Sequence, residues 1–120
     1  MVLIMGGAYQ GKLDYAKTAF DISNADVFTC NGDTIDFSKR CIYGIEVFSR
    51  HCDDPIAYFK AHRAQWENSI LICQDIFCGV VPMGADIRVW RQNTGRLCQY
   101  LSGEATQVSR IFCGLEQRLK

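Results

Sequence analysis

Eight residues near the amino terminus have types and spacing that could hold a phosphate group. The segment Gly6-Gly7-Ala8-Tyr9-Gln10-Gly11-Lys12-Leu13 fits the pattern G-x-x-x-x-G-K and departs from it at the eighth position. Glycines let the backbone wrap around a phosphate, and the loop amides point inward at it. Lys12 would place a point charge on the outer phosphates of a nucleotide. The segment therefore predicts a nucleotide-binding loop over residues 6–13.

The eighth position bears on metal binding. A serine or threonine there would ligate Mg²⁺, and Leu13 cannot. Asp14 is not an obvious substitute, because each successive side chain of a helix turns by about 100°. Water can fill the coordination sphere of Mg²⁺, so the leucine would impair metal-dependent chemistry without abolishing it. The alternative interpretation of the whole segment is a glycine-rich strand-to-helix turn that carries an ordinary surface lysine.

The elements around this loop predict an α/β fold. Val2 to Met5 is a short apolar run that predicts a buried strand before the loop, and the spacing of apolar residues from Leu13 to Phe20 predicts a helix after it. Further strands are expected at residues 25–30, 41–48, 69–76 and 108–113, and further helices at residues 55–66 and 84–103. Asp53 or Asp54 is expected to cap the first of these helices, with Pro55 in its first turn.

Alternating strands and helices are typical of a mostly parallel sheet with helices on both faces. Ligands of such folds bind beyond the carboxyl ends of the strands, where the loop at residues 6–13 would lie. The 120 residues fit one domain, and 48% hydrophobic with 22% charged residues is an ordinary globular composition.

Charge and cysteine content exclude several classes of protein. Thirteen basic and thirteen acidic residues give a formal net charge of zero without a basic stripe, which argues against nucleic-acid and membrane-surface partners. No run approaches the roughly 20 apolar residues of a membrane helix, and no signal peptide is recognisable, so we expect a cytoplasmic protein. The seven cysteines include no Cys-x-x-Cys pair, and only two histidines occur, so we predict buried thiols and no metal site.

Segments at both ends of the chain resemble the bifunctional adenosylcobinamide kinase/adenosylcobinamide-phosphate guanylyltransferase family. The segment from Gln74 to Pro82 is similar to the family's Asn-Glu-Val-Gly-x-Gly-Ile/Val-Val-Pro, and the segment from Val108 to Leu115 is similar to its closing strand and Ser-Gly-Leu-Pro. The segment from Met5 to Lys12 resembles its Gly-Gly-Ala-Arg-Ser-Gly-Lys-Ser loop. The expected helix between the segments at residues 74–82 and 108–115 also carries residues that match the family, namely Arg88, Arg91, Gly95, Arg96, Leu97 and Gln99. Together the matches cover a little under half of the chain.

The resemblance implies a P-loop NTPase-like fold and a specific chemistry. Members of the family bind ATP or GTP at the loop, phosphorylate a hydroxyl of the corrinoid adenosylcobinamide, and transfer GMP through a covalent histidine. They are typically trimers, so the resemblance also implies a homo-oligomer. In this chain it assigns nucleotide contacts to residues 6–13 and the outer phosphates to Lys12. Asp75 or Glu46 would orient Mg²⁺ or the attacking hydroxyl.

Several residues depart from the family's pattern. Leu13, Gln10 and Tyr9 replace its Ser, Ser and Arg, and Gln74-Asp75 replaces Asn-Glu. The stretch that carries the guanylylated histidine is largely missing, and neither His51 nor His62 lies in a matching place, so we predict that guanylyltransferase activity is lost. Glu46 is the only carboxylate near the family's acidic position, and we expect it in the middle of a strand.

Three hypotheses follow for function. The chain is a kinase with an altered site, a nucleotide-binding or regulatory relative without turnover, or a scaffold that pairs with a partner. Glu46 and Asp75 also have structural interpretations, as an ion-pair partner and as the cap of a strand end. Arg88 and Arg91 share a helix face and would reach a phosphate, a neighbouring subunit or only solvent.

Overall fold

A computed structural model describes residues 1–77 and 84–120 of the chain, and its strands form one sheet. The order across this six-stranded sheet is β2-β3-β4-β1-β5-β6. The strands in chain order are β1 (Val2–Gly6), β2 (Val27–Thr29), β3 (Cys41–Tyr43), β4 (Ile70–Gln74), β5 (Gln107–Phe112) and β6 (Leu115–Arg118). All neighbours are parallel except β5 and β6, so the expected α/β class and mostly parallel sheet are confirmed.

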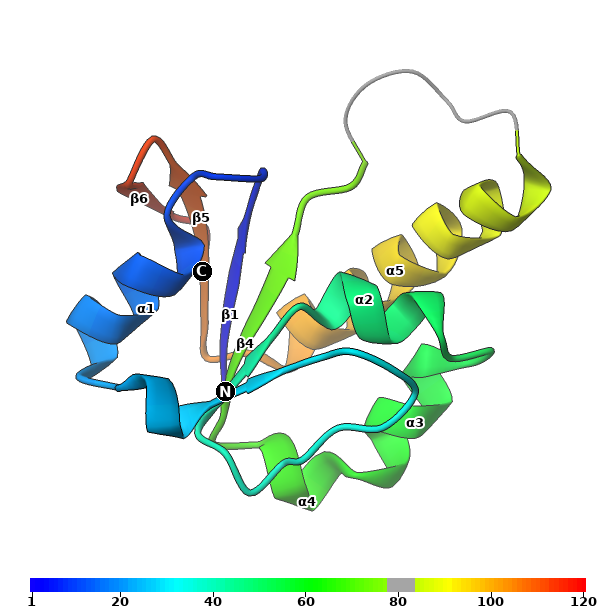
Figure 1. Cartoon of the computed structure of the whole chain (residues 1–120), viewed down its shortest axis with the longest axis horizontal. Coiled ribbons are helices and arrows are strands. Elements are labelled where there is room, and N and C mark those ends of the chain that lie inside the picture. Colours follow the sequence, from blue (N-terminus) through cyan, green and yellow to red (C-terminus); the bar gives the residue numbers. More distant parts are fainter. Residues whose placement is uncertain (78–83) are drawn as a thin grey trace.

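The helices cover both faces of this sheet (Figure 1). They are α1 (Lys12–Phe20), a short 3₁₀ turn η1 (Asn24–Asp26), α2 (Ile45–Arg50), α3 (Pro55–Ala61), α4 (Arg63–Trp66) and α5 (Ala85–Glu104). One face packs against α1 through a cluster that includes Ile4, Ala16 and Ile111. The opposite face packs against α2–α5 through a larger cluster that includes Leu3, Trp66 and Leu97. Alternate residues of β1 therefore belong to different clusters, as the two-residue period of a strand requires.

The strand expected at residues 41–48 is wrong beyond Tyr43. Gly44 adopts a left-handed conformation with φ of 87°, which ends β3, and α2 begins at the next residue. Ile45 and Phe48 are buried on the sheet side of this helix, so their three-residue spacing was helical. The apolar and β-branched content of the segment had favoured a strand. Glu46 consequently lies in the first turn of a helix and not in mid-strand.

The helix expected at residues 55–66 is divided in two at His62. The side chain of Asp54 accepts a hydrogen bond from the backbone N–H of Ala57 at 3.1 Å, and Pro55 occupies the first turn, which confirms the expected cap. His62 ends α3 and precedes α4, and its Nδ1 lies 2.7 Å from the carbonyl oxygen of Tyr58. The fully buried Trp66 then donates from Nε1 to the carbonyl oxygen of Phe59 at 2.7 Å.

The remaining elements match the sequence except at the carboxyl terminus. The expected β1, α1, β2, β4, α5 and β5 are present with small shifts of their bounds. The chain was expected to end its sheet with the strand at residues 108–113, but a two-residue turn at Cys113 and Gly114 leads into the additional antiparallel strand β6. Every residue of β6 is exposed, so it lacks the apolar alternation that predicts a strand. The expected match at residues 78–82 lies outside the described residues.

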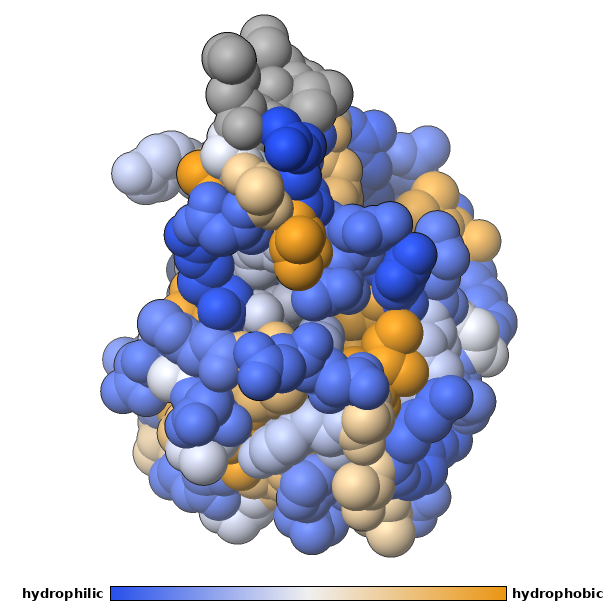
Figure 2. All heavy atoms as spheres, turned by 90° about the vertical axis from the view of Figure 1, so that its right-hand side faces the viewer, coloured by the Kyte–Doolittle hydropathy of each residue, from blue (hydrophilic) through white to orange (hydrophobic). Residues whose placement is uncertain are grey.

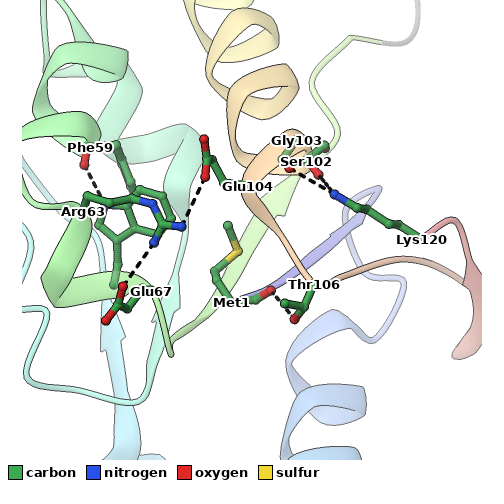
Figure 3. A network of polar contacts seen from close by, with 10 residues as sticks. Met1, Phe59, Arg63, Glu67, Ser102, Gly103, Glu104, Thr106 and Lys120 are labelled. Carbon is green, nitrogen blue, oxygen red and sulfur yellow. Dashed lines mark hydrogen bonds and ion pairs between the residues drawn. The ribbon is translucent and has the colours of Figure 1, made fainter.

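Polar contacts join the termini and helices at the amino ends of the parallel strands (Figure 3). The carbonyl oxygen of Met1 accepts hydrogen bonds from the backbone N–H and the side-chain hydroxyl of Thr106. Lys120 Nζ donates to the carbonyl oxygens of Ser102 and Gly103 at 3.0 and 3.1 Å. Arg63 pairs with Glu104 at 3.2 Å and joins α4 to α5. These contacts hold the elements together at this edge of the sheet, and the glycine-rich loop at residues 6–13 lies at the opposite edge, after β1.

Buried thiols account for most of the cysteines that the structure describes. Cys30, Cys41, Cys73 and Cys98 are buried, and no disulfide joins cysteines within residues 1–77 and 84–120. Burial raises the pKa of Cys41 to about 11 and that of Cys30 to about 12, with Glu46 adding to the second shift. The thiols of Cys30 and Cys41 are therefore protonated at neutral pH and pack as small apolar groups.

The outer surface over α2, α3 and α5 is predominantly hydrophilic, with apolar side chains scattered singly (Figure 2). One of these is Val89 on α5, with 53% of its surface exposed. Among the helices of the described residues, none combines the length and hydrophobicity needed to span a bilayer.

We predict that Asp54→Ala lowers the free energy of unfolding by about 1 kcal/mol, because the first turn of α3 loses its cap. Asp53→Ala is the matched control, since the adjacent Asp53 does not cap α3. Urea denaturation followed by circular dichroism measures both. Equal losses in the two variants would contradict the role of the cap.

Candidate functional site

A cavity of about 540 Å³ opens beside the glycine-rich loop, residues 6–13. Its wall includes the loop residues Ala8, Tyr9, Gly11, Lys12 and Leu13, together with Asp14, Tyr43 and Gln74. Tyr43 and Gln74 are the last residues of β3 and β4, and the loop follows β1. The cavity therefore lies at the carboxyl edge of three adjacent parallel strands, where ligands of open α/β sheets bind.

The loop bends through two residues with positive φ. Tyr9 has φ of 60° and a fully exposed side chain, and Gly11 has φ of 91° immediately before α1. Left-handed residues within a tight loop turn backbone N–H groups toward a common centre, which is the arrangement that binds anions. Gly11 also stands at the amino end of α1, where the helix dipole adds positive potential.

Lys12 is held inside the loop, with only 5% of its surface exposed. Its Nζ donates to the carbonyl oxygen of Gly7 at 2.7 Å, so the side chain folds back across the loop that precedes it. Burial lowers the pKa of Lys12, while attraction from Glu46 and Cys73 opposes this shift. An anion bound in the loop would compensate the desolvated ammonium group.

Gly6 allows β5 to approach the start of the loop. A Cβ atom at this position would lie 2.5 Å from the carbonyl oxygen of Ile111, which is closer than van der Waals contact permits. Gly6 itself accepts a hydrogen bond from the backbone N–H of Asp75 at 2.7 Å. The first glycine of the motif is therefore required by packing between strands as well as by the loop.

The loop is fastened to the turn between β5 and β6. Gln10 Oε1 accepts a hydrogen bond from the backbone N–H of Cys113 at 2.6 Å, and the carbonyl oxygen of Gln10 accepts from Gly114 at 2.9 Å. Gly11 approaches the same turn, because a Cβ built on it would lie 3.6 Å from the Cα of Gly114. Through Gln10, the turn between β5 and β6, about a hundred residues away in the sequence, holds the loop in place.

Glu46 is brought to the site by α2, which α5 holds in place. Glu46 Oε1 accepts a hydrogen bond from the backbone N–H of Gln74 at 2.8 Å. Trp90 Nε1 of α5 donates to the carbonyl oxygen of Glu46 at 2.8 Å. Deeper between the two helices, the hydroxyls of Ser49 and Thr94 share a buried hydrogen bond of 2.7 Å. Attraction from Glu46 raises the pKa of Lys12 against the effect of burial, so these two predicted residues lie within electrostatic reach of each other without forming an ion pair among the described contacts.

Asp75 lies on a different side of the loop. It borders a separate cavity of about 150 Å³ with Gly7, Gln10 and Arg110. Its Oδ1 accepts a hydrogen bond from the backbone N–H of Phe77 at 2.9 Å, which fits its interpretation as the cap of a strand end. The structure therefore does not gather Lys12, Glu46 and Asp75 around one point.

The other polar residues singled out in the sequence lie away from the large cavity. His51 is exposed at the end of α2, and the ring of His62 packs against Tyr58. Arg91 Nη2 donates to the carbonyl oxygen of Phe77, whereas Arg88 and Arg96 are exposed on α5. Within the described residues, no group of three or more His, Cys, Asp or Glu side chains is arranged to hold a metal ion.

Three residues of the cavity, Asp14, Tyr43 and Gln74, were not among the predicted site residues. Asp14 had been set aside as a substitute metal ligand. Gln74 had been noted only as part of a motif, and Tyr43 had been placed inside a longer strand. Both are strand-terminal residues: Gln74 ends β4, which pairs with the loop strand β1, and Tyr43 ends β3, which pairs with β4. The end of each strand was the signal that could have found them, because parallel strands present their carboxyl ends at one edge.

Comparisons with known proteins add no relative. Neither a scan against protein-family models nor a search of curated proteins found a match for this chain. The site therefore rests on its own geometry and on the resemblance described above.

We predict that Gly6→Ala lowers the free energy of unfolding by about 1–3 kcal/mol, the usual range for overpacking a tight site. The new methyl group must displace the backbone of β5, because its nearest neighbour is the carbonyl oxygen of Ile111. Gly7→Ala is the matched control, since its Cβ meets only the side chain of Gln10 at 3.6 Å. Thermal unfolding compares the two. A Gly6→Ala variant as stable as the control would contradict the close approach.

Proposed function

We propose that the protein binds a nucleoside triphosphate, ATP or GTP, with its phosphates in the loop at residues 6–13. The observation that carries this proposal is the buried Lys12, which lies inside a glycine-rich loop at the amino end of α1. Within residues 1–77 and 84–120, no carboxylate forms an ion pair with Lys12, so there must be another reason for burying its charge to 5% exposure. A bound phosphate supplies that reason.

The adjacent cavity supports a nucleotide as the ligand. Its volume of about 540 Å³ falls in the range of small-molecule sites. The wall combines residues of the loop with Tyr43 and Gln74, which both carry polar groups. The loop would take the phosphates, and the polar groups at the ends of β3 and β4 would contact the rest of the ligand.

Phosphoryl transfer to a hydroxyl is the reaction that this arrangement favours. Such transfer depends on positioning and on stabilising charge, which Lys12 and the loop amides would supply. Glu46 lies within electrostatic reach of Lys12. The hydrogen bond from the backbone N–H of Gln74 fixes the orientation of the Glu46 carboxylate. We propose that Glu46 orients the attacking hydroxyl or a hydrated Mg²⁺. The resemblance proposes a corrinoid of the cobinamide type as the acceptor and no guanylyl transfer.

Binding without turnover is the second candidate, and Leu13 favours it. Its side chain lines the cavity where a metal-ligating hydroxyl would stand. A protein of this kind would act as a regulatory subunit or as a scaffold in a partner complex. Release of ADP or GDP in the presence of adenosylcobinamide distinguishes a kinase from a protein that binds the nucleotide without turnover.

We expect Lys12→Met to weaken ATP and GTP binding roughly tenfold to a hundredfold, which corresponds to one charge-assisted hydrogen bond of about 1.5–3 kcal/mol. Methionine keeps most of the apolar stem and removes the charge. Isothermal titration calorimetry with and without Mg²⁺ measures the change.

Lys17→Met is the control for that experiment, because Lys17 is on the same helix but its Nζ contacts Asn24. It should bind as the unmodified protein does. If neither nucleotide binds the unmodified protein, or if Lys12→Met binds equally well, the proposal is wrong.

We expect Leu13→Thr to increase the ratio of nucleotide affinities measured with and without Mg²⁺. The substitution restores a hydroxyl at the position from which loops of this kind ligate the ion. Leu13→Val is the matched control, because valine has the shape of threonine without its hydroxyl. An equal ratio in both variants would place the metal outside the reach of residue 13.

A further inference from the structure

Strand β6 forms one of the two edges of the sheet, and all four of its residues are exposed. Three large apolar side chains on or beside it are also exposed, namely Phe112 (59%), Leu115 (73%) and Leu119 (59%). An open edge with apolar side chains invites another strand, and natural sheets usually protect such edges.

The register with β5 shows which backbone groups of β6 point outward. The turn at Cys113 and Gly114 has positive φ at both residues, as two-residue hairpins require. Pairs alternate along an antiparallel ladder, and the backbone N–H of Leu119 donates inward to Val108 at 2.8 Å. By this alternation the backbone of Gln117 also bonds inward, to Arg110. The N–H and C=O groups of Glu116 and Arg118 therefore face outward.

The order of side chains along this edge is complementary to itself. If two copies of β6 pair antiparallel about a two-fold axis at Gln117, Glu116 lies opposite Arg118 of the second copy. Leu115 then lies opposite Leu119 of that copy. The outward backbone groups of Glu116 and Arg118 form the hydrogen-bonded pairs of this ladder. Opposite charges and apolar side chains that face each other across strands stabilise the pairing.

We propose that β6 pairs with β6 of a second copy of this chain and makes a two-fold dimer with one continuous sheet. The formal net charge of zero weakly favours such association, because the two copies do not repel each other through a net charge. A strand from an unrelated protein would satisfy the backbone groups, but it would have no reason to match both the ion pairs and the leucine pairs. This inference is independent of nucleotide binding.

The first test is a cross-link at the axis. The two copies of residue 117 form a pair that is not hydrogen-bonded, with Cα atoms about 4.5 Å apart, which lies within disulfide range. We expect Gln117→Cys to form a disulfide-linked dimer with oxidised glutathione on a non-reducing gel. The unmodified protein, which retains its exposed Cys113, is the control and should cross-link far less.

The second test exchanges the charges. Arg118→Glu places two carboxylates opposite each other on both sides of the axis, so we expect a shift from twice the 13.6 kDa chain mass to the mass of one chain in light scattering. Adding Glu116→Arg to this variant restores opposite charges and should restore the dimer. Leu115→Lys should also give monomers, whereas Val89→Lys, which changes an exposed apolar residue on α5, should not.

The outcomes separate the proposal from its alternatives. A dimer that cross-links at residue 117 and is rescued by the charge exchange supports it. If light scattering gives the mass of one chain at every protein concentration measured, the proposal is wrong, and a strand of another protein becomes the occupant of this edge. A trimer also overturns it, because two identical edges that pair about a two-fold axis close as a dimer. A dimer whose cross-linking matches the unmodified protein places the interface elsewhere.

Discussion

Pairing of β1 on both of its edges is the constraint on which the candidate site depends. Strand β1 lies between β4 and β5 in the sheet. After β1, the chain passes through α1 to β2 on one side of the sheet order. After β4, it passes through α5 in the opposite direction, beyond β1, to β5. Right-handed crossovers in opposite directions put these two helices on opposite faces of the sheet. The segments that follow β1 and β4 therefore leave the sheet in different directions (Figure 1). The cavity lies at this edge and is lined by the loop and by the last residues of β3 and β4.

Polar contacts with β4 and α5 then determine where α2 places Glu46. Glu46 is fixed at both its ends, by the N–H of Gln74 on its side chain and by Trp90 on its carbonyl. The hydroxyl pair between Ser49 and Thr94 fixes the rotation of α2 against α5, since a buried hydroxyl without its partner would be strongly unfavourable. A change in α5 would consequently move Glu46 without touching the loop.

The sequence predicted the parts of the fold whose signals are local. The apolar run before Gly6 and the helical spacing after Lys12 define the loop and its flanking elements, and the twenty residues of α5 have a clear apolar stripe. Two features were out of reach for opposite reasons. The segment after Gly44 has strand-like residue types, but it follows a left-handed residue and forms a helix. Strand β6 has no alternating pattern of apolar residues and forms because it pairs with β5. The approach of Lys12 to Glu46 is tertiary, because their elements meet only at the edge of the sheet.

Leu13 shows how the fold and the chemistry of the loop compete for one position. Its side chain packs partly against the apolar cluster under α1 and also lines the cavity. A hydroxyl there would serve a metal ion but would give up apolar contact with the sheet. The main-chain amides of the loop and the ammonium group of Lys12 do not depend on this choice. Anion binding can therefore persist in a loop of this kind after its metal ligand is replaced, which is why binding and turnover are separate questions for this protein.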